Sequence, residues 1–176
     1  EGTAFLVFLG LAEAEKKEPR MSFQAAKITA LVSRALGIHQ NFSPVLDINN
    51  NPENPIITIR AFGETAESVT ACGMAYVKGL QEHGMIATAK HFPGHGDTLT
   101  DSHLELPVLL HSREHLERTE LAPFKKILKQ GIDSVMIGHI GVPALDASGT
   151  PSSLSKEIIT GWLRQHWRYN GLIVSD

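Results

Sequence analysis

The chain of 176 residues has one cysteine, few aromatic residues and no block of basic residues. A lone cysteine, Cys72, excludes an internal disulfide and a metal site built from several thiolates, so we interpret it as a small core residue. The formal net charge is -3, and no basic stripe interleaved with aromatic residues occurs, which argues against nucleic acid as a partner. No apolar run approaches the roughly 20 residues of a membrane span.

The first residues also lack the features of a targeting segment. Residues 5–11 are apolar, but no basic region precedes them, which argues against a signal peptide. The sequence begins at Glu1 rather than Met, so we expect a fragment or a processed piece of a longer protein. The absence of a leader and the single unpaired cysteine favour the cytoplasm. With 42% hydrophobic and 20% charged residues, the composition is typical of a globular domain.

Hydrophobic periodicity alternates between helix and strand along the chain. Helices are expected over residues 22–36, 65–82 and 113–129, and after Ser155, a plausible N-cap. Apolar strands are expected over residues 42–46, 85–89, 134–138 and 172–176. This alternation predicts parallel βαβ units, whose strands are covered on both faces. Four clear strands leave two interpretations, a small open α/β sheet or part of a barrel, since a closed (β/α)8 barrel takes about 250 residues.

Polar residues stand at the carboxyl end of every expected strand. They are Asp47, Lys90 with His91, His139, and Ser175 with Asp176. In parallel α/β folds the loops at these ends converge on one face and carry the catalytic groups. A single polar residue there is commonly a structural hydrogen-bonding group, whereas several on one rim favour an active site.

The densest group of titratable residues is the loop KHFPGHGDTLTDSH at positions 90–103. Five titratable side chains follow its first residue: His91, His95, Asp97, Asp101 and His103. Two glycines between them let a ligand approach the backbone closely. Two chemistries fit: metal-assisted hydrolysis, and acid/base catalysis in which Asp101 orients His103. The lack of a helical HExxH pattern and of a cysteine cluster favours the second.

This loop resembles the signature loop of bacterial β-N-acetylglucosaminidases in glycoside hydrolase family 3. FSPVLDINNNPENPIITIRAFGE, at positions 42–64, is similar to a strand-loop segment of that family, and residues 135–176 are similar to the stretch that leads to its nucleophile. The resemblance implies that residues 1–176 are part of the N-terminal catalytic domain. The implied fold is of the α/β class, a TIM-like (β/α)8 barrel, here an incomplete internal fragment with about four to five parallel strands.

The resemblance also implies a role for six residues. Asp176 matches the catalytic nucleophile, His103 the general acid/base and Asp101 its partner in a dyad. Three residues match positions that bind the sugar in the reactive subsite: Arg60, Lys90 and His91. No metal and no other cofactor is implied.

The implied enzyme is a retaining exo-β-N-acetylglucosaminidase that removes terminal β-linked N-acetylglucosamine through a covalent glycosyl–Asp176 intermediate. Its partner would be a small carbohydrate, from peptidoglycan fragments during recycling or from chitooligosaccharides, and the oligomeric state stays open. Because a neutral histidine base does not repel phosphate, phosphorolysis stays open as well. Two alternatives are a non-catalytic carbohydrate-binding fragment and a metal-dependent hydrolase that uses His91, His95, Asp97 and His103.

Overall fold

A computed structural model describes Gly10 and residues 20–54, 56–98 and 106–176. The elements in chain order are α3 (Met21–Ala35), β1 (Gln40–Asn41), η1 (Thr58–Arg60), α4 (Ala66–Gln81), β2 (Ile86–Phe92), α5 (Arg113–Arg118), α6 (Leu121–Gln130), β3 (Ser134–Ile137), η2 (Ser152–Leu154), η3 (Glu157–His166) and β4 (Leu172–Ser175). The strands form one parallel sheet in the order β1-β2-β3-β4. The predicted α/β class and four parallel strands are therefore confirmed. Within these described residues, no helix is both long enough and apolar enough to span a membrane.

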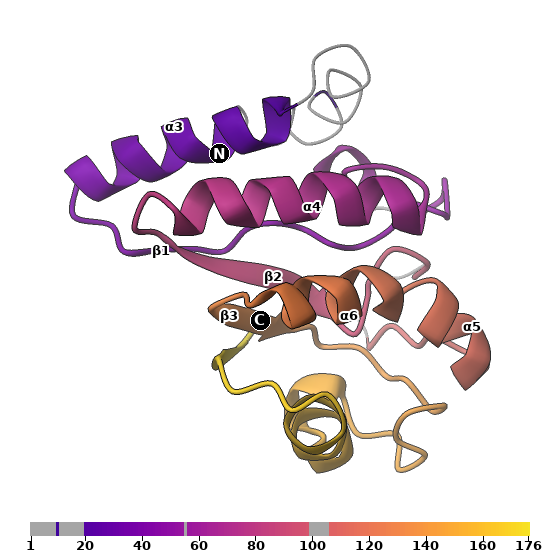
Figure 1. Ribbon diagram of the computed structural model, residues 1–176. Helices are drawn as coiled ribbons and strands as arrows, with labels where there is room; N and C mark the ends of the chain where they lie inside the picture. The colour runs from indigo at the N-terminus through magenta and orange to yellow at the C-terminus, as the bar shows by residue number, and fades with distance from the viewer. Residues whose placement is uncertain (1–9, 11–19, 55, 99–105) are drawn as a thin grey trace.

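The helices are arranged along the sheet in the same order as the strands. In Figure 1, α3, α4 and α6 succeed one another down the view, and the gold helix η3 lies below them. The register pairs Thr88 of β2 with Ser134 of β3, and Ile137 with Ser175 of β4. Because all the strands run the same way, their carboxyl ends meet at one edge, where the polar residues were expected.

The core lies between the sheet and these helices. Phe92 of β2 is fully buried and meets Phe124 of α6 and Trp167 edge-to-face, with ring centroids 5.4 and 5.5 Å apart. Such aromatic pairs add about 0.5–1.5 kcal/mol each to the stability given by burial. Gly79 of α4 lets α3 approach closely, since a Cβ there would lie 2.5 Å from the carbonyl oxygen of Phe23. Packing thus fixes β2 firmly between its neighbours.

The strand predicted over residues 42–46 is wrong in its bounds, because the regular strand β1 is Gln40–Asn41 and ends before residue 42. Pro44 has no N–H to donate, so a regular ladder cannot continue through it. The segment nevertheless runs beside β2: Lys90 donates its N–H to the carbonyl of Pro44 at 3.1 Å, and Leu46 donates to that of Lys90 at 2.6 Å. Asp47 therefore still arrives at the carboxyl edge.

The single helix predicted over residues 113–129 is also wrong, because the structure has two helices, α5 and α6, separated at Thr119. Pro123 explains the break, since its ring would collide with the carbonyl of Thr119 in a continuous helix. The other helices agree with the prediction to within two residues. Thr65 caps α4 by accepting the N–H of Ser68, and the hydroxyl of Ser155 accepts the N–H of Ile158 where the last helix begins.

Candidate active site

His91, near the end of β2, lies between two carboxylates at the carboxyl edge of the sheet. Its Nδ1 is 2.6 Å from Oδ2 of Asp47, and its Nε2 is 3.9 Å from Oδ2 of Asp176. The side chains of His91 and Asp47 are 5% and 0% exposed, whereas that of Asp176 is 36% exposed. The Asp47 carboxylate is thus buried beside Nδ1 of His91, and the Asp176 carboxylate lies on the side of Nε2.

Asp47 is the buried anchor of this group. Its Oδ1 accepts the backbone N–H of His95 at 2.7 Å, and its Oδ2 is the partner of the His91 ring. Burial alone would raise the pKa of the Asp47 carboxyl, but attraction to His91 and the hydrogen bonds hold that pKa below its ordinary value. Asp47 therefore stays ionised and fixes the orientation of the His91 ring.

Two cations face the same edge. Burial, together with the guanidinium of Arg60 at the end of η1, lowers the pKa of the Lys90 ammonium, whereas the carboxylates of Asp176 and Asp47 oppose this shift. The Lys90 ammonium therefore interacts electrostatically with the other three charged groups. A sugar hydroxyl entering this edge would meet both donors and acceptors.

The loop after β2 is held by buried polar contacts. Asn54 donates its side-chain amide to the carbonyl oxygens of His95 at 2.8 Å and of Gly96 at 3.0 Å. The ring Nδ1 of His95 is hydrogen-bonded to the Thr98 hydroxyl. Burial lowers the pKa of His95 more than the nearby Asp47 carboxylate raises it, so this ring is neutral at neutral pH. Gly96 is required here, because a Cβ would lie 1.7 Å from the carbonyl oxygen of Ile48.

Four of the six predicted site residues interact at this edge. His91 lies 3.9 Å from Asp176, and the charges of Arg60 and Asp176 act on the Lys90 ammonium. The other two, Asp101 and His103, lie outside the described residues. His139, the strand-end residue of β3, points its Nδ1 to the Ser153 hydroxyl at 2.6 Å and is exposed. Its interaction is thus with the loop that follows β3.

The metal interpretation of the loop is not supported by the residues that can be placed. His91 pairs with Asp47, His95 with Thr98, and Asp97 with His111, its Oδ2 lying 2.6 Å from Nε2 of that ring. Within the part of the chain that the structure describes, these three loop residues do not gather into a group with metal-binding geometry. The fourth residue of that hypothesis, His103, lies outside the described residues.

Sequence reasoning missed the structural importance of Asp47 and His95. Asp47 was recognised only as one polar residue at a strand end, and its burial was not foreseen. Its partner depends on the parallel register, which places residues after neighbouring strands side by side and which hydrophobic periodicity does not state. The sequence offers His95 a role only in the metal-dependent alternative, whereas its ring is bound to Thr98 within its own loop.

Carboxylates and cations at the carboxyl edge of a parallel α/β sheet are suited to binding and cleaving a polar substrate such as a sugar. The family model described as "Glycosyl hydrolase family 3 N terminal domain" matches residues 1–176. The chain belongs to this family, which confirms the predicted family, the TIM-barrel-like α/β fold class and the class of glycoside hydrolases.

Curated proteins and a solved structure are similar to most of this chain. "Beta-hexosaminidase A" of Pseudoalteromonas piscicida is 39% identical over 166 residues, which cover 86% of this chain and 28% of that protein. "Beta-N-acetylglucosaminidase/beta-glucosidase" of Cellulomonas fimi is 37% identical over 162 residues, covering 87% and 29%. A solved family 3 β-N-acetylglucosaminidase from Paenibacillus sp. str. FPU-7 is 46% identical with a TM-score of 0.91, covering 97% of this chain and 32% of that one. The chain thus spans less than a third of each.

Proposed function

We propose that the protein is a retaining exo-β-N-acetylglucosaminidase and that residues 1–176 are part of its catalytic barrel domain. The observation that carries the proposal is the convergence of Lys90, His91 and Asp176 at one sheet edge, where the loop 90–103 begins. The names of the similar proteins support N-acetylglucosamine as the sugar. The natural substrates would be peptidoglycan fragments or chitooligosaccharides, with the cytoplasm as the site of peptidoglycan recycling.

In the proposed mechanism, the carboxylate of Asp176 attacks the anomeric carbon while protonated His103 gives its proton to the leaving oxygen. The bond to the leaving group breaks as the glycosyl–Asp176 ester forms with inverted configuration. Neutral His103 then takes a proton from water, which attacks the same carbon, and the second inversion gives net retention. Asp101 would hold the His103 ring and stabilise its protonated form.

Arg60, Lys90 and His91 would bind the hydroxyl groups of the sugar. The bond between Asp47 and Nδ1 of His91 leaves Nε2 as the ring atom that faces Asp176 and the substrate. Because Nδ1–H donates its hydrogen bond to the Asp47 carboxylate, Nε2 is the ring nitrogen left to meet a sugar hydroxyl. The ring would therefore position the anomeric carbon in front of the nucleophile.

The covalent intermediate provides the direct test. We would incubate the full-length gene product with a 5-fluoro glycoside, which forms its ester faster than it hydrolyses it, and map the sugar adduct by mass spectrometry. The expected adduct lies on Asp176, and Asp176→Asn should lose it along with more than about a thousandfold of kcat/KM. Asp133→Asn is the matched control, because Asp133 is exposed and precedes β3 rather than following a strand. Turnover without any adduct would refute a retaining mechanism.

The role of His103 is tested by the leaving group. His103→Ala should slow poor leaving groups by about 10²–10⁴-fold and activated aryl glycosides much less, because only a poor leaving group needs a proton. Exogenous azide cannot donate a proton to the leaving oxygen, so it should not restore the rate on substrates with poor leaving groups. His39→Ala, at an exposed histidine before β1, is the control. Equal losses for both kinds of substrate would remove His103 from the acid role.

Substrate and acceptor are separate questions with separate measurements. Comparing kcat/KM for aryl N-acetylglucosaminides and aryl glucosides distinguishes the two activities named for the Cellulomonas fimi relative. Adding phosphate and searching for a sugar 1-phosphate distinguishes phosphorolysis from hydrolysis. Activity that is lost to a chelator but survives Asp176→Asn would instead favour the metal-dependent alternative. Sugar binding without turnover would favour the non-catalytic one.

A further inference from the structure

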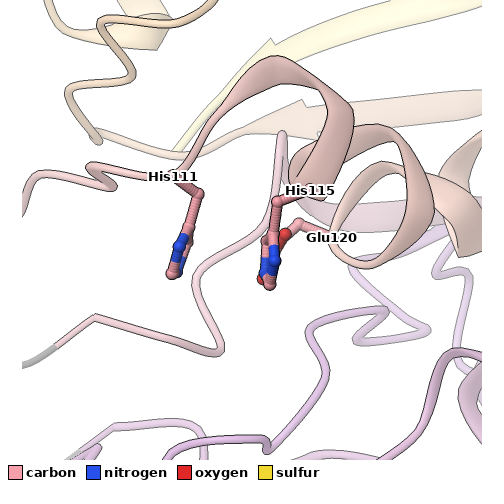
Figure 2. A group of neighbouring side chains, drawn as sticks. All are labelled: His111, His115 and Glu120. Atoms are coloured by element: carbon pink, nitrogen blue, oxygen red, sulfur yellow. The ribbon is translucent and has the colours of Figure 1, made fainter.

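Three side chains that belong neither to the Asp47–His91 pair nor to the predicted site gather beside helices α5 and α6. Figure 2 shows His111, His115 and Glu120 directed to the same side, with the two rings side by side. The rings are stacked, with centroids 4.2 Å apart and planes inclined by 23°. One ligand atom from each of the three residues lies within 4.8 Å of the other two, and Nε2 of His115 is 3.6 Å from Oε1 of Glu120.

The cluster contains buried polar atoms whose partners are missing among the described residues. Glu120 is 2% exposed, and its Oε1 accepts a hydrogen bond from the Asn50 amide at 3.3 Å. Its Oε2 and Nε2 of His115 are buried and have no hydrogen-bond partner in the part of the chain that the structure describes. A buried carboxylate is costly unless it is paired with a cation or coordinates a metal. The Glu120 carboxylate and Nε2 of His115 are therefore both available to the same positively charged ligand.

Asp97 gives the cluster the feature that metal-bound histidines share. Its Oδ2 lies 2.6 Å from Nε2 of His111, so a carboxylate fixes the orientation of one ring. Histidines that bind metals are generally oriented by such a carboxylate or by a carbonyl group. The loop after β2, to which Asp97 belongs, also touches Glu120: a Cβ on Gly94 would lie 2.7 Å from the Glu120 Cβ.

We propose that His111, His115 and Glu120 bind a divalent first-row transition metal, with zinc as the best fit. Two imidazoles and one carboxylate suit Zn²⁺, which takes such ligands at about 2.0–2.2 Å. Ligands at that distance in a tetrahedron lie roughly 3.3–3.6 Å apart, which agrees with the separation of His115 and Glu120. The ion would join the loop after β2 to α5 and α6. The ion would stabilise the packing of these segments and would take no part in glycoside cleavage.

Metal binding by the full-length gene product tests the proposal. After removal of metals with a chelator, titration with Zn²⁺ followed by calorimetry should show one equivalent that His115→Gln and Glu120→Gln both lose. Asp97→Asn should keep this equivalent but weaken it about 10–100-fold, because it removes only the orienting carboxylate. His39→Gln, at an exposed histidine outside the cluster, is the matched control and should bind as the wild type does.

The number of zinc equivalents bound per protein distinguishes this site from zinc binding at other histidines. Zn²⁺ should also raise the melting temperature of the wild type and of His39→Gln, but not that of the two ligand variants. Circular dichroism of the metal-free proteins checks that each variant is folded. If His115→Gln does not fold, Glu120→Gln, which keeps the acceptor for Asn50, still tests the site. Equal numbers of zinc equivalents in the wild type and both folded ligand variants would overturn the proposal.

Discussion

Replacing Asp47 by Asn should destabilise the domain more than any exposed aspartate substitution. The carboxylate is buried and accepts hydrogen bonds from the His91 ring and from the His95 backbone. Asn keeps one oxygen, which can still serve the His95 N–H. However, it places an amide NH₂ where Oδ2 met Nδ1 of His91, so the ring must change its tautomer or lose the contact.

The expected cost follows from the interactions that are lost. One charge-assisted hydrogen bond contributes about 1.5–3 kcal/mol, and leaving the partner of a buried pair alone costs up to about 3–5 kcal/mol. Because one of the two short bonds survives, we expect a loss of about 2–4 kcal/mol in the free energy of unfolding. For a complete barrel domain of about 250 residues, each kcal/mol moves the melting temperature by about 2–4 °C, so the shift should be about 4–16 °C.

Differential scanning calorimetry of the full-length gene product measures this shift, with Asp133→Asn as the exposed control. The pKa of Asp47 is lower in the folded state than in the unfolded chain, so its contribution is complete above the unfolded value of about 3.8–3.9 and is lost as the pH falls through the folded value. The gap between the wild type and Asp47→Asn should therefore be constant from pH 7 to about pH 5 and narrow below about pH 4. A gap no larger than that of Asp133→Asn, or one that widens on acidification, would refute the reasoning.

Three further substitutions test the contacts around the site. Gly96→Ala should cost about 3 kcal/mol or more and reduce activity, because its Cβ would lie 1.7 Å from the carbonyl oxygen of Ile48. Gly161→Ala, in a helix with room for a methyl group, should be neutral or stabilising in the same melting assay. Arg60→Gln should raise the pKa of Lys90 toward its ordinary value, so that amine labelling of Lys90 begins at higher pH; an unchanged labelling profile contradicts the assigned cause. Thr65→Ala should cost about 1 kcal/mol by removing the cap of α4, and Thr65→Ser should restore the stability.

The sequence could place the site at one edge of the sheet but not describe its contacts. Helix and strand periodicity are local signals, and they predicted the parallel strands with polar residues at their ends. The contact between Asp47 and His91 joins residues 44 positions apart and depends on how two strands are aligned. Periodicity does not state that alignment, so neither the burial of Asp47 nor the fixed His91 ring could be predicted.

The cluster of His111, His115 and Glu120 shows the same boundary between local and tertiary information. Two histidines four residues apart are a common metal-ligand spacing, which could have been recognised. Glu120 could not have been added, because in a continuous helix it would point about 140° away from His115, five residues earlier. The break at Thr119, imposed by Pro123, is what turns Glu120 toward the rings.

The two carboxylates that flank His91 support different roles because their surroundings differ. Asp47 is fully buried, its oxygens are occupied by His91 and His95, and its pKa is low, so it has no free lone pair directed at a substrate. Asp176 lies 3.9 Å from the ring, beyond hydrogen-bond distance, so its carboxylate is not committed to His91. A nucleophile must be both ionised and accessible, whereas an orienting group must be ionised and immobile. The proposed nucleophile is therefore Asp176, and the same reasoning makes Asp47 the group that holds the histidine against it.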